Sequence, residues 1–216
     1  MTMKIVELHP DNPQPRLVRQ IVAVLNDGGT IALPTDSGYA VACMLGNKDG
    51  MDVIRRIRNL DDKHNFSLLC QSFGQLGELV IVENKAYRTI NALTPGAYTF
   101  ILPATKEVPR MTLNKKKKTV GVRLPDHKVT QAIVEELGAP LLCSTLIMPG
   151  EDEPLTDAEE VAARIGAELG FSAGDIESGL LPEDKVRLVD QMSQDLAGLG
   201  KVAFVGDGVN DAAALA

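Results

Sequence analysis

A polar turn after a buried strand holds residue types that could contact a small molecule. The apolar segment 31–33 is expected to break at Pro34, pass through the polar turn 35–38 and become apolar again at residue 39. Ligands of open α/β sheets bind at strand tips, so hydroxyl and carboxylate groups placed there are candidate ligand contacts. The candidates are Thr35, Ser37 and Tyr39. An ordinary turn uses the same residue types, and this alternative stays open.

Basic and hydroxyl side chains gather at the ends of later predicted elements. They are Arg55, Arg56, Arg58 and Lys63 after the turn, Arg123 at the end of one strand, and Ser144 and Thr145 at the end of another. If these groups converge, they make a cavity for phosphate or carboxylate, to which arginine can donate two parallel hydrogen bonds. The arginine cluster is equally compatible with a solvated helix face.

Nucleic acid is a second candidate partner. The run Lys115–Lys118 could contact a phosphate backbone, although adjacent lysines in a loop also form ordinary solvated surface and no aromatic residues interleave them. The sequence has neither a Walker loop nor a Gly-x-Gly-x-x-Gly turn. A nucleotide would therefore be bound in an unusual way.

Composition indicates a soluble globular protein. The 216 residues can bury one large core or two modest ones. No window approaches the roughly 18 consecutive apolar residues of a membrane span, and no signal peptide is recognised, so we expect a cytoplasmic protein. The three cysteines lie apart in apolar runs and lack metal-ligand spacing with the three histidines, which favours reduced core thiols over disulfides or zinc.

The charge changes sign along the chain. Residues 1–150 hold 18 Lys+Arg and 14 Asp+Glu, whereas residues 151–216 hold 4 and 15, which together give the net charge of −7. The chain therefore changes character near Gly150.

Strands and helices mingle without strict alternation, which predicts a twisted mixed sheet flanked by helices. The predicted strands are 4–8, 31–33, 66–70, 98–102, 119–124 and 141–145, and the predicted helices begin near 15, 52, 75, 84 and 128. Beyond residue 150 we expect a helix capped by Thr156 or Asp157 and closed by Gly170, a helix from Pro182, and a short strand at 202–205.

Four motifs in order closely resemble the YrdC-like family, and its YciO branch in particular. They are Leu-Pro-Thr-Asp-Ser-Gly-Tyr at 33–39, Thr-Pro-Gly-Ala-Tyr-Thr-Phe-Ile-Leu at 94–102, Gly-Val-Arg-Leu-Pro at 121–125 and Pro-Leu-Leu-Cys-Ser-Thr at 140–145. The resemblance covers about residues 4–155, which we treat as a domain spanning 1–155. It implies an α/β (α+β) fold: a twisted mixed sheet with flanking helices and a basic concave cavity that binds nucleotide.

The resemblance also implies a reaction. Threonylcarbamoyl-AMP synthases of this family convert threonine, bicarbonate and ATP to threonylcarbamoyl-adenylate and pyrophosphate, with magnesium, for later transfer to tRNA. By position, Thr35 and Tyr39 would then face the amino acid, while Arg58, Arg123, Ser144 and Thr145 would line the nucleotide side, with Lys63 nearby. The implied partners are ATP or AMP, L-threonine, and tRNA or double-stranded RNA.

This sequence departs from the synthases at two motifs. Their Lys-x-Arg reads Arg58-Asn59-Leu60 here, and their Ser-x-Asn reads Thr145-Leu146-Ile147, so apolar side chains replace one guanidinium and one carboxamide. Similar departures typify the YciO branch. Threonylcarbamoyl-AMP synthase activity of the nucleotidyltransferase type is therefore an open expectation, catalytic residues stay unassigned, and a non-catalytic RNA-binding module is the alternative.

Residues 156–216 resemble something else, the phosphorylation domain of P-type metal-transporting ATPases in the haloacid dehalogenase-like superfamily. The matching stretches are 161–170, 180–186 and the tail 202–215. In that family the residue matching Lys185 contacts phosphate, and those matching Asp207 and Asp211 serve the magnesium site. The Asp-Lys-Thr-Gly-Thr nucleophile motif is absent from the sequence, so a magnesium-dependent phosphatase or ATPase is the least favoured function.

The second segment thus looks like a partial haloacid dehalogenase-like α/β fragment. A natural fusion, an engineered or generated chimera, and a frameshifted reading frame all stay open as its origin. Its strand at 202–205 could join the sheet of the first segment or lie beside it, and both arrangements are kept as alternatives.

Overall fold

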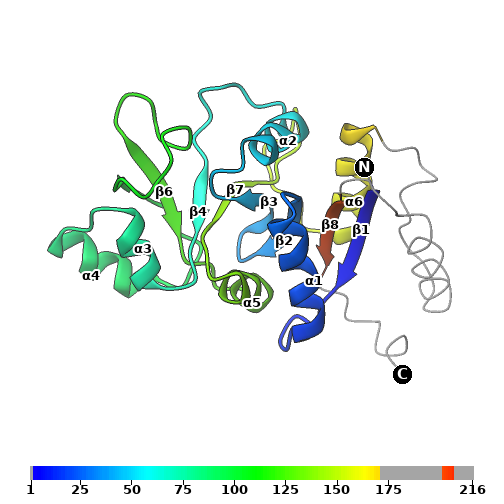
Figure 1. Ribbon diagram of the computed structural model, residues 1–216, viewed down its shortest axis with the longest axis horizontal. Helices are drawn as coiled ribbons and strands as arrows, with labels where there is room; N and C mark the ends of the chain where they lie inside the picture. Colours follow the sequence, from blue (N-terminus) through cyan, green and yellow to red (C-terminus); the bar gives the residue numbers. More distant parts are fainter. Residues whose placement is uncertain (1, 171–200, 207–216) are drawn as a thin grey trace.

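A computed structural model describes residues 2–170 and 201–206 (Figure 1). Its strands are β1 (Thr2–Glu7), β2 (Thr30–Thr35), β3 (Gly38–Met44), β4 (Ser67–Leu69), β5 (Phe100–Pro103), β6 (Thr119–Arg123), β7 (Leu141–Thr145) and β8 (Lys201–Gly206). Its helices are α1 (Pro15–Asn26), α2 (Lys48–Arg58), α3 (Phe73–Leu79), α4 (Asn84–Leu93), α5 (Lys128–Leu137) and α6 (Ala158–Leu169). None of the helices in these described ranges is long and apolar enough to cross a bilayer.

The strands form one mixed sheet in the order β1-β8-β2-β3-β7-β4-β6-β5. Parallel pairs join β1 to β8, β8 to β2 and β4 to β6, and the other neighbours are antiparallel. β3 and β7 lie at its centre, with Ala40 opposite Thr145 and Val41 opposite Ser144. The predicted twisted mixed sheet flanked by helices is therefore confirmed.

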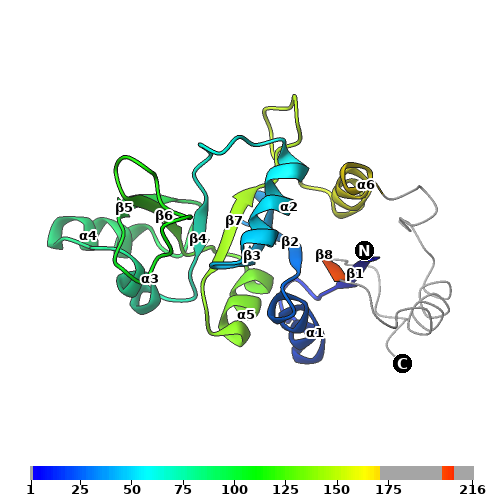
Figure 2. The ribbon, with the colours of Figure 1, turned by 45° about the horizontal axis from the view of Figure 1, so that its top comes forward.

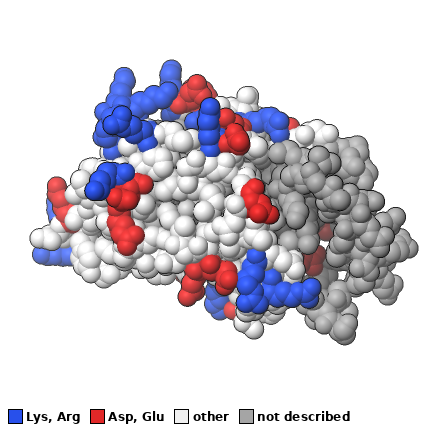
Figure 3. Space-filling view, viewed as in Figure 1, with Lys and Arg blue, Asp and Glu red and all other residues white. Residues whose placement is uncertain are grey.

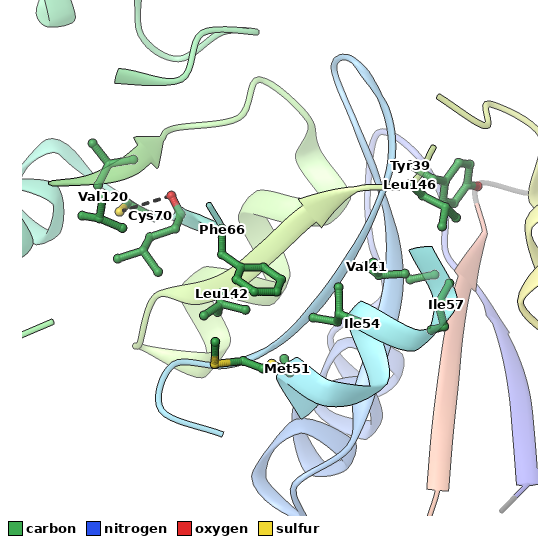
Figure 4. Close-up of a cluster of buried hydrophobic side chains, with 14 of the residues drawn as sticks. Tyr39, Val41, Met51, Ile54, Ile57, Phe66, Cys70, Val120, Leu142 and Leu146 are labelled. Atoms are coloured by element: carbon green, nitrogen blue, oxygen red, sulfur yellow. Dashed lines mark hydrogen bonds between the residues drawn. The ribbon is translucent and has the colours of Figure 1, made fainter. Parts of the chain in front are cut away.

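Helices cover both faces of this sheet. Helices α1 and α5 pack on one face, where Ile21, Leu25 and Ile133 share a buried cluster with residues of β2 and β7. Helix α2 packs on the other, and Figure 2 shows it on the side opposite α1 and α5. Figure 4 shows Met51 and Ile54 of α2 beside Leu142 of β7.

Capping explains why two helices start and end where they do. The Asn47 side chain accepts a hydrogen bond from Gly50 N at 2.9 Å, so α2 begins at Lys48, four residues before the predicted start. Asn59 ends α2 in the left-handed region. Asp157 caps α6 by accepting from Glu160 N at 2.8 Å, and Gly170 closes it, as predicted.

The prediction that the strand breaks at Pro34 is wrong. β2 continues through Pro34, which pairs with Tyr39 of β3 in a tight hairpin. On its other side β2 pairs with β8 only at Ile31 and Ala32. At Pro34, therefore, β2 pairs with β3 on one side and with no described strand on the other. Proline, which has no N–H to donate, is tolerated at such an edge position.

The strand expected at 202–205 joins the sheet instead of lying beside it. β8 sits between β1 and β2 and is parallel to both. Helix α6 contributes Val161, Ala162 and Ile165 to the same buried cluster as α2 and β3. The boundary at residue 155 stays a prediction, and the helix expected from Pro182 lies outside the described residues.

Gly38 allows a close approach between the β2–β3 hairpin and the segment that leads to α6. Its φ is +94°, and a Cβ there would lie 2.9 Å from Pro154 Cβ and 3.0 Å from the Leu155 carbonyl oxygen. Leu155 O accepts from Tyr39 N, and Leu155 N donates to Leu146 O, so the segment is bonded to the hairpin and to the end of β7.

We predict that Gly38→Ala lowers the free energy of unfolding by about 3 kcal/mol, because it adds overpacking to left-handed strain. Gly28→Ala is the matched control, since Gly28 has φ +84° and nothing within 4 Å of its Cβ position. Gly28→Ala should lower the free energy of unfolding only by the backbone strain, about 1–2 kcal/mol. Urea unfolding of both variants measures the difference, and equal losses would contradict the packing role of Gly38.

Candidate functional site

The β2–β3 hairpin is held by its own hydroxyl groups. Thr35 Oγ1 donates to the Gly38 carbonyl at 2.6 Å and accepts from Ser37 N at 3.2 Å. It also lies 3.3 Å from Ser37 Oγ. Thr35 is buried, so its hydroxyl orders the turn in this structure. Its predicted contact with an amino acid stays a prediction.

Arg123 binds this hairpin through an ion pair. Its Nη2 pairs with Asp36 Oδ1, and its Nη1 donates to Ser37 Oγ at 2.8 Å. The second Asp36 oxygen accepts from Asp126 N at 2.9 Å. Arg123 and Asp36 are 9 % and 14 % exposed, so each side chain has lost most of its water. The charge of Arg123 is thus balanced inside the protein.

Arg58 is held differently, by neutral oxygens. Its Nε donates to the Ile147 carbonyl at 3.1 Å, and its Nη1 donates to Ser144 Oγ at 2.6 Å. Burial lowers the pKa of its guanidinium from the ordinary value. Within residues 2–170 and 201–206 no carboxylate forms an ion pair with Arg58. Among the residues that the structure describes, Arg58 therefore carries a partly desolvated positive charge with no carboxylate paired to it.

His64 is a third member of this cluster, and we did not predict it from the sequence. Its Nε2 lies 3.0 Å from Ser144 Oγ, and its ring meets the Phe66 ring edge-on at 5.3 Å. Burial lowers the pKa of His64, the positive charges of Arg58 and Arg55 lower it further, and Asp61 acts in the opposite direction. Only its place in a polar loop next to Lys63 could have signalled it.

The remaining predicted residues lie apart from the Arg58 side chain. Tyr39 is 3 % exposed and lies beside Leu146 in the core (Figure 4). Thr145 is half-buried at the end of β7, opposite Ala40. Lys63 is exposed, and its backbone N–H donates to Asp61 Oδ1 at 2.9 Å. The structure thus joins Arg58 to Ser144, and Arg123 to Ser37 and Thr35, in two separate hydrogen-bonded clusters.

The cysteines do not contribute to either cluster. Cys43, Cys70 and Cys143 are free and buried, as predicted, and burial raises the pKa of each thiol to about 12. Such thiols stay protonated and are poor nucleophiles and poor metal ligands.

The part of the chain that is described holds no group of three His, Cys, Asp or Glu side chains able to bind a metal ion. The predicted magnesium ligands Asp207 and Asp211, and the predicted phosphate contact Lys185, lie outside the described residues.

Comparison with known proteins matches most of the chain to one family. The model of the Sua5/YciO/YrdC family, described as "Telomere recombination", matches residues 23–181. The uncharacterized protein YciO of Escherichia coli K12 is 43 % identical over 183 residues, which cover 85 % of this chain and 87 % of YciO. A threonylcarbamoyl-AMP synthase of Vibrio vulnificus is 25 % identical over 155 residues, covering 70 % of this chain and 82 % of the synthase.

Solved structures agree with these matches. The crystal structure of E. coli YciO superposes with a TM-score of 0.73 at 46 % identity, covering 76 % of this chain and 79 % of YciO. P. abyssi Sua5, crystallised with L-threonine, has a TM-score of 0.69 at 18 % identity, covering 96 % of this chain and 51 % of Sua5, and shows the fold alone. The resemblance of residues 156–216 to a P-type ATPase gains no support from these matches.

We predict that Arg123 acts on stability. Arg123→Ala should lower the free energy of unfolding by about 3 kcal/mol, because it leaves the Asp36 carboxylate buried without its partner. Lys128→Ala is the control, since Lys128 pairs with Asp11 at 2.8 Å where both side chains are more than half exposed, and it should leave stability nearly unchanged. Equal effects in thermal unfolding would contradict the assignment.

Proposed function

The chain belongs to the Sua5/YciO/YrdC family, and we propose from the geometry of its site that it binds an adenine nucleotide through Arg58. In this proposal the protein is a divergent relative of threonylcarbamoyl-AMP synthases, with ATP or AMP as ligand and L-threonine as the amino acid substrate. The described part of the chain supports a nucleotide-binding role more directly than it supports full catalysis.

The observation that carries the proposal is the state of Arg58. A half-buried cation normally pairs with a carboxylate or shifts its protonation, and arginine cannot lose its proton in a protein. Arg58 instead uses two of its five N–H groups on Ser144 and Ile147, both neutral acceptors. These bonds fix the plane of the guanidinium, and in this proposal its other N–H groups bind the anion. A phosphate group supplies the missing charge and accepts two hydrogen bonds at once.

Arg123 is less suited to that role because Asp36 already neutralises it. A ligand phosphate would have to displace a carboxylate that is also bonded to Asp126 N. In this proposal Arg123 supports the hairpin that carries Thr35 and Ser37, and Arg58 contacts the nucleotide.

Catalysis would depend on positioning and charge neutralisation. Magnesium, when bound, would neutralise phosphate charge, and it usually reaches such sites with one or two carboxylates and the phosphates of the substrate. The described residues offer no all-protein cage for it. We therefore infer that magnesium would enter with ATP.

The altered Ser-x-Asn motif has a structural counterpart. Leu146 is fully buried in the core, and the backbone carbonyl of Ile147 holds Arg58 Nε. An asparagine carboxamide at position 147 would be an additional donor, which the isoleucine side chain cannot provide. We expect nucleotide binding to persist and pyrophosphate release from ATP, threonine and bicarbonate to be slow.

We predict that Arg58→Ala weakens AMP and ATP binding at least tenfold, because a hydrogen bond to a charged group contributes about 1.5–3 kcal/mol. Arg56→Ala is the matched control: Arg56 is exposed in the same last turn of α2, and its loss should change affinity less than twofold. Calorimetric titration of the full chain measures both. Equal affinities in the two variants would refute the role of Arg58.

A second candidate function is the binding of tRNA or double-stranded RNA. Lys115–Lys118 are exposed, and Asn114 Oδ1 accepts from the N–H groups of Lys116 and Lys117, which orders the loop. Figure 3 shows lysine and arginine side chains gathered at the top left of the molecule, over the loop that leads into β6. A loop of this kind is a suitable contact for a phosphate backbone.

We predict that any RNA affinity falls steeply with salt, since each phosphate contact releases counter-ions. Replacing all four lysines of the loop with alanine should flatten the dependence of log K on log salt. Fluorescence anisotropy with a duplex RNA at several salt concentrations measures the slope. A slope unchanged by the substitutions would exclude this loop as the RNA contact.

A further inference from the structure

The Ser144 hydroxyl lies between a permanent donor and a group that can change its protonation. Arg58 Nη1 donates to Ser144 Oγ at 2.6 Å, and His64 Nε2 lies 3.0 Å from the same oxygen. A hydroxyl has one hydrogen and two lone pairs. Arg58 occupies one lone pair, so the state of His64 decides where the hydroxyl hydrogen points.

The neutral imidazole with its hydrogen on Nδ1 and the protonated imidazole give opposite arrangements, whereas a neutral imidazole with its hydrogen on Nε2 would donate to Ser144 as the protonated form does. A neutral imidazole with its hydrogen on Nδ1 accepts the Ser144 hydrogen at Nε2. A protonated imidazole donates from Nε2 to Ser144 Oγ, which then accepts two bonds and must turn its own hydrogen elsewhere. In the second state the hydroxyl becomes a donor for a ligand next to Arg58.

The groups packed around His64 decide which state the site prefers. Arg58 and Arg55 approach from α2, Asp61 from the loop after it, and Phe66, the residue before β4, contacts the ring. Arg55 lies over the Phe66 ring at 5.4 Å and pairs with Asp52, which partly balances its charge. Burial and Arg58 favour neutral His64 in the absence of a ligand. An anion bound at Arg58 would reverse the repulsion between Arg58 and the imidazolium.

We propose that His64 is a positioning residue: it turns the Ser144 hydroxyl toward an anion bound at Arg58, and the binding of that anion takes up one proton at His64. The inference deepens the proposed nucleotide function and rests on it. It assigns a role to a residue that the family motifs quoted above do not include.

The sign of the effect follows from linkage. A ligand that raises the pKa of His64 binds protonated protein more tightly, so its affinity rises as pH falls through that pKa. A rise of one pKa unit corresponds to a tenfold change in affinity between pH values well above and well below it. The AMP phosphate titrates near about pH 6 and works in the opposite direction, because it loses charge as pH falls.

The test is the pH dependence of AMP and sulfate binding to the full chain, measured by calorimetry between about pH 5.5 and 8. Sulfate keeps its charge over this range, so its affinity reports on the protein alone. The pH dependence of AMP binding to His64→Gln shows how much of the change in AMP affinity comes from titration of the AMP phosphate. We expect sulfate affinity to rise by up to about tenfold toward low pH in the unsubstituted protein, and this rise to vanish in His64→Gln. Ser144→Ala should weaken sulfate binding at low pH, because the hydroxyl that His64 turns toward the anion is missing.

A measurement on the unsubstituted protein covers the case in which a variant fails to fold. The chain has three histidines, so NMR can follow the His64 imidazole signal during a pH titration. We expect saturating AMP to raise the pKa of His64 by about one unit.

The outcomes separate this inference from the proposed function. AMP binding with the same pH dependence in the protein and in His64→Gln, and an unmoved His64 titration curve, would overturn the role of His64 and leave nucleotide binding intact. Failure of both AMP and sulfate to bind would overturn both proposals.

Discussion

A guanidinium that leaves water must regain hydrogen bonds and, where it can, an opposite charge. Two arginines of this protein meet that constraint in different ways. Arg123 finds Asp36, and the pair ties the end of β6 to the β2–β3 hairpin. Within the described part of the chain, Arg58 donates to Ser144 and Ile147, two neutral acceptors at the end of β7. The charge of Arg123 is balanced by Asp36, although its buried Nε has no hydrogen-bond partner among the described residues. In the proposed function a ligand of negative charge balances Arg58.

The fold brings these groups into position. β3 and β7 lie side by side at the centre of the sheet, so the residues that end β7 are neighbours of those that begin β3. Helix α2 packs on them through Met51, Ile54 and Ile57 and ends at Arg58, which places the guanidinium beside Ser144. The left-handed Asn59 then turns the chain into the loop that carries His64. A short segment thus supplies both groups that bind Ser144.

Much of this arrangement could be predicted from the sequence. Helices α4 and α5 begin at the expected residues and strand β7 has the expected bounds. Regular spacing of apolar residues and helix- or strand-ending residues mark these elements in the sequence. Ser144 and Arg58 were identified from their positions at element ends. Pro34 was misjudged because a sequence cannot show which side of a strand lacks a neighbour. The sequence does not reveal Asp36 and His64 as partners, because their roles depend on contacts with residues 87 and 80 positions away, at Arg123 and Ser144.

The most direct measurement follows the arginine Nε–H signals by NMR while AMP is added to the full chain. If Arg58 is the ligand's counter-ion, its signal should shift and saturate with AMP, while the Arg123 signal, whose guanidinium is paired with Asp36, should stay in place. A shift of the Arg123 signal with no change at Arg58 would contradict the assignment of the nucleotide to Arg58.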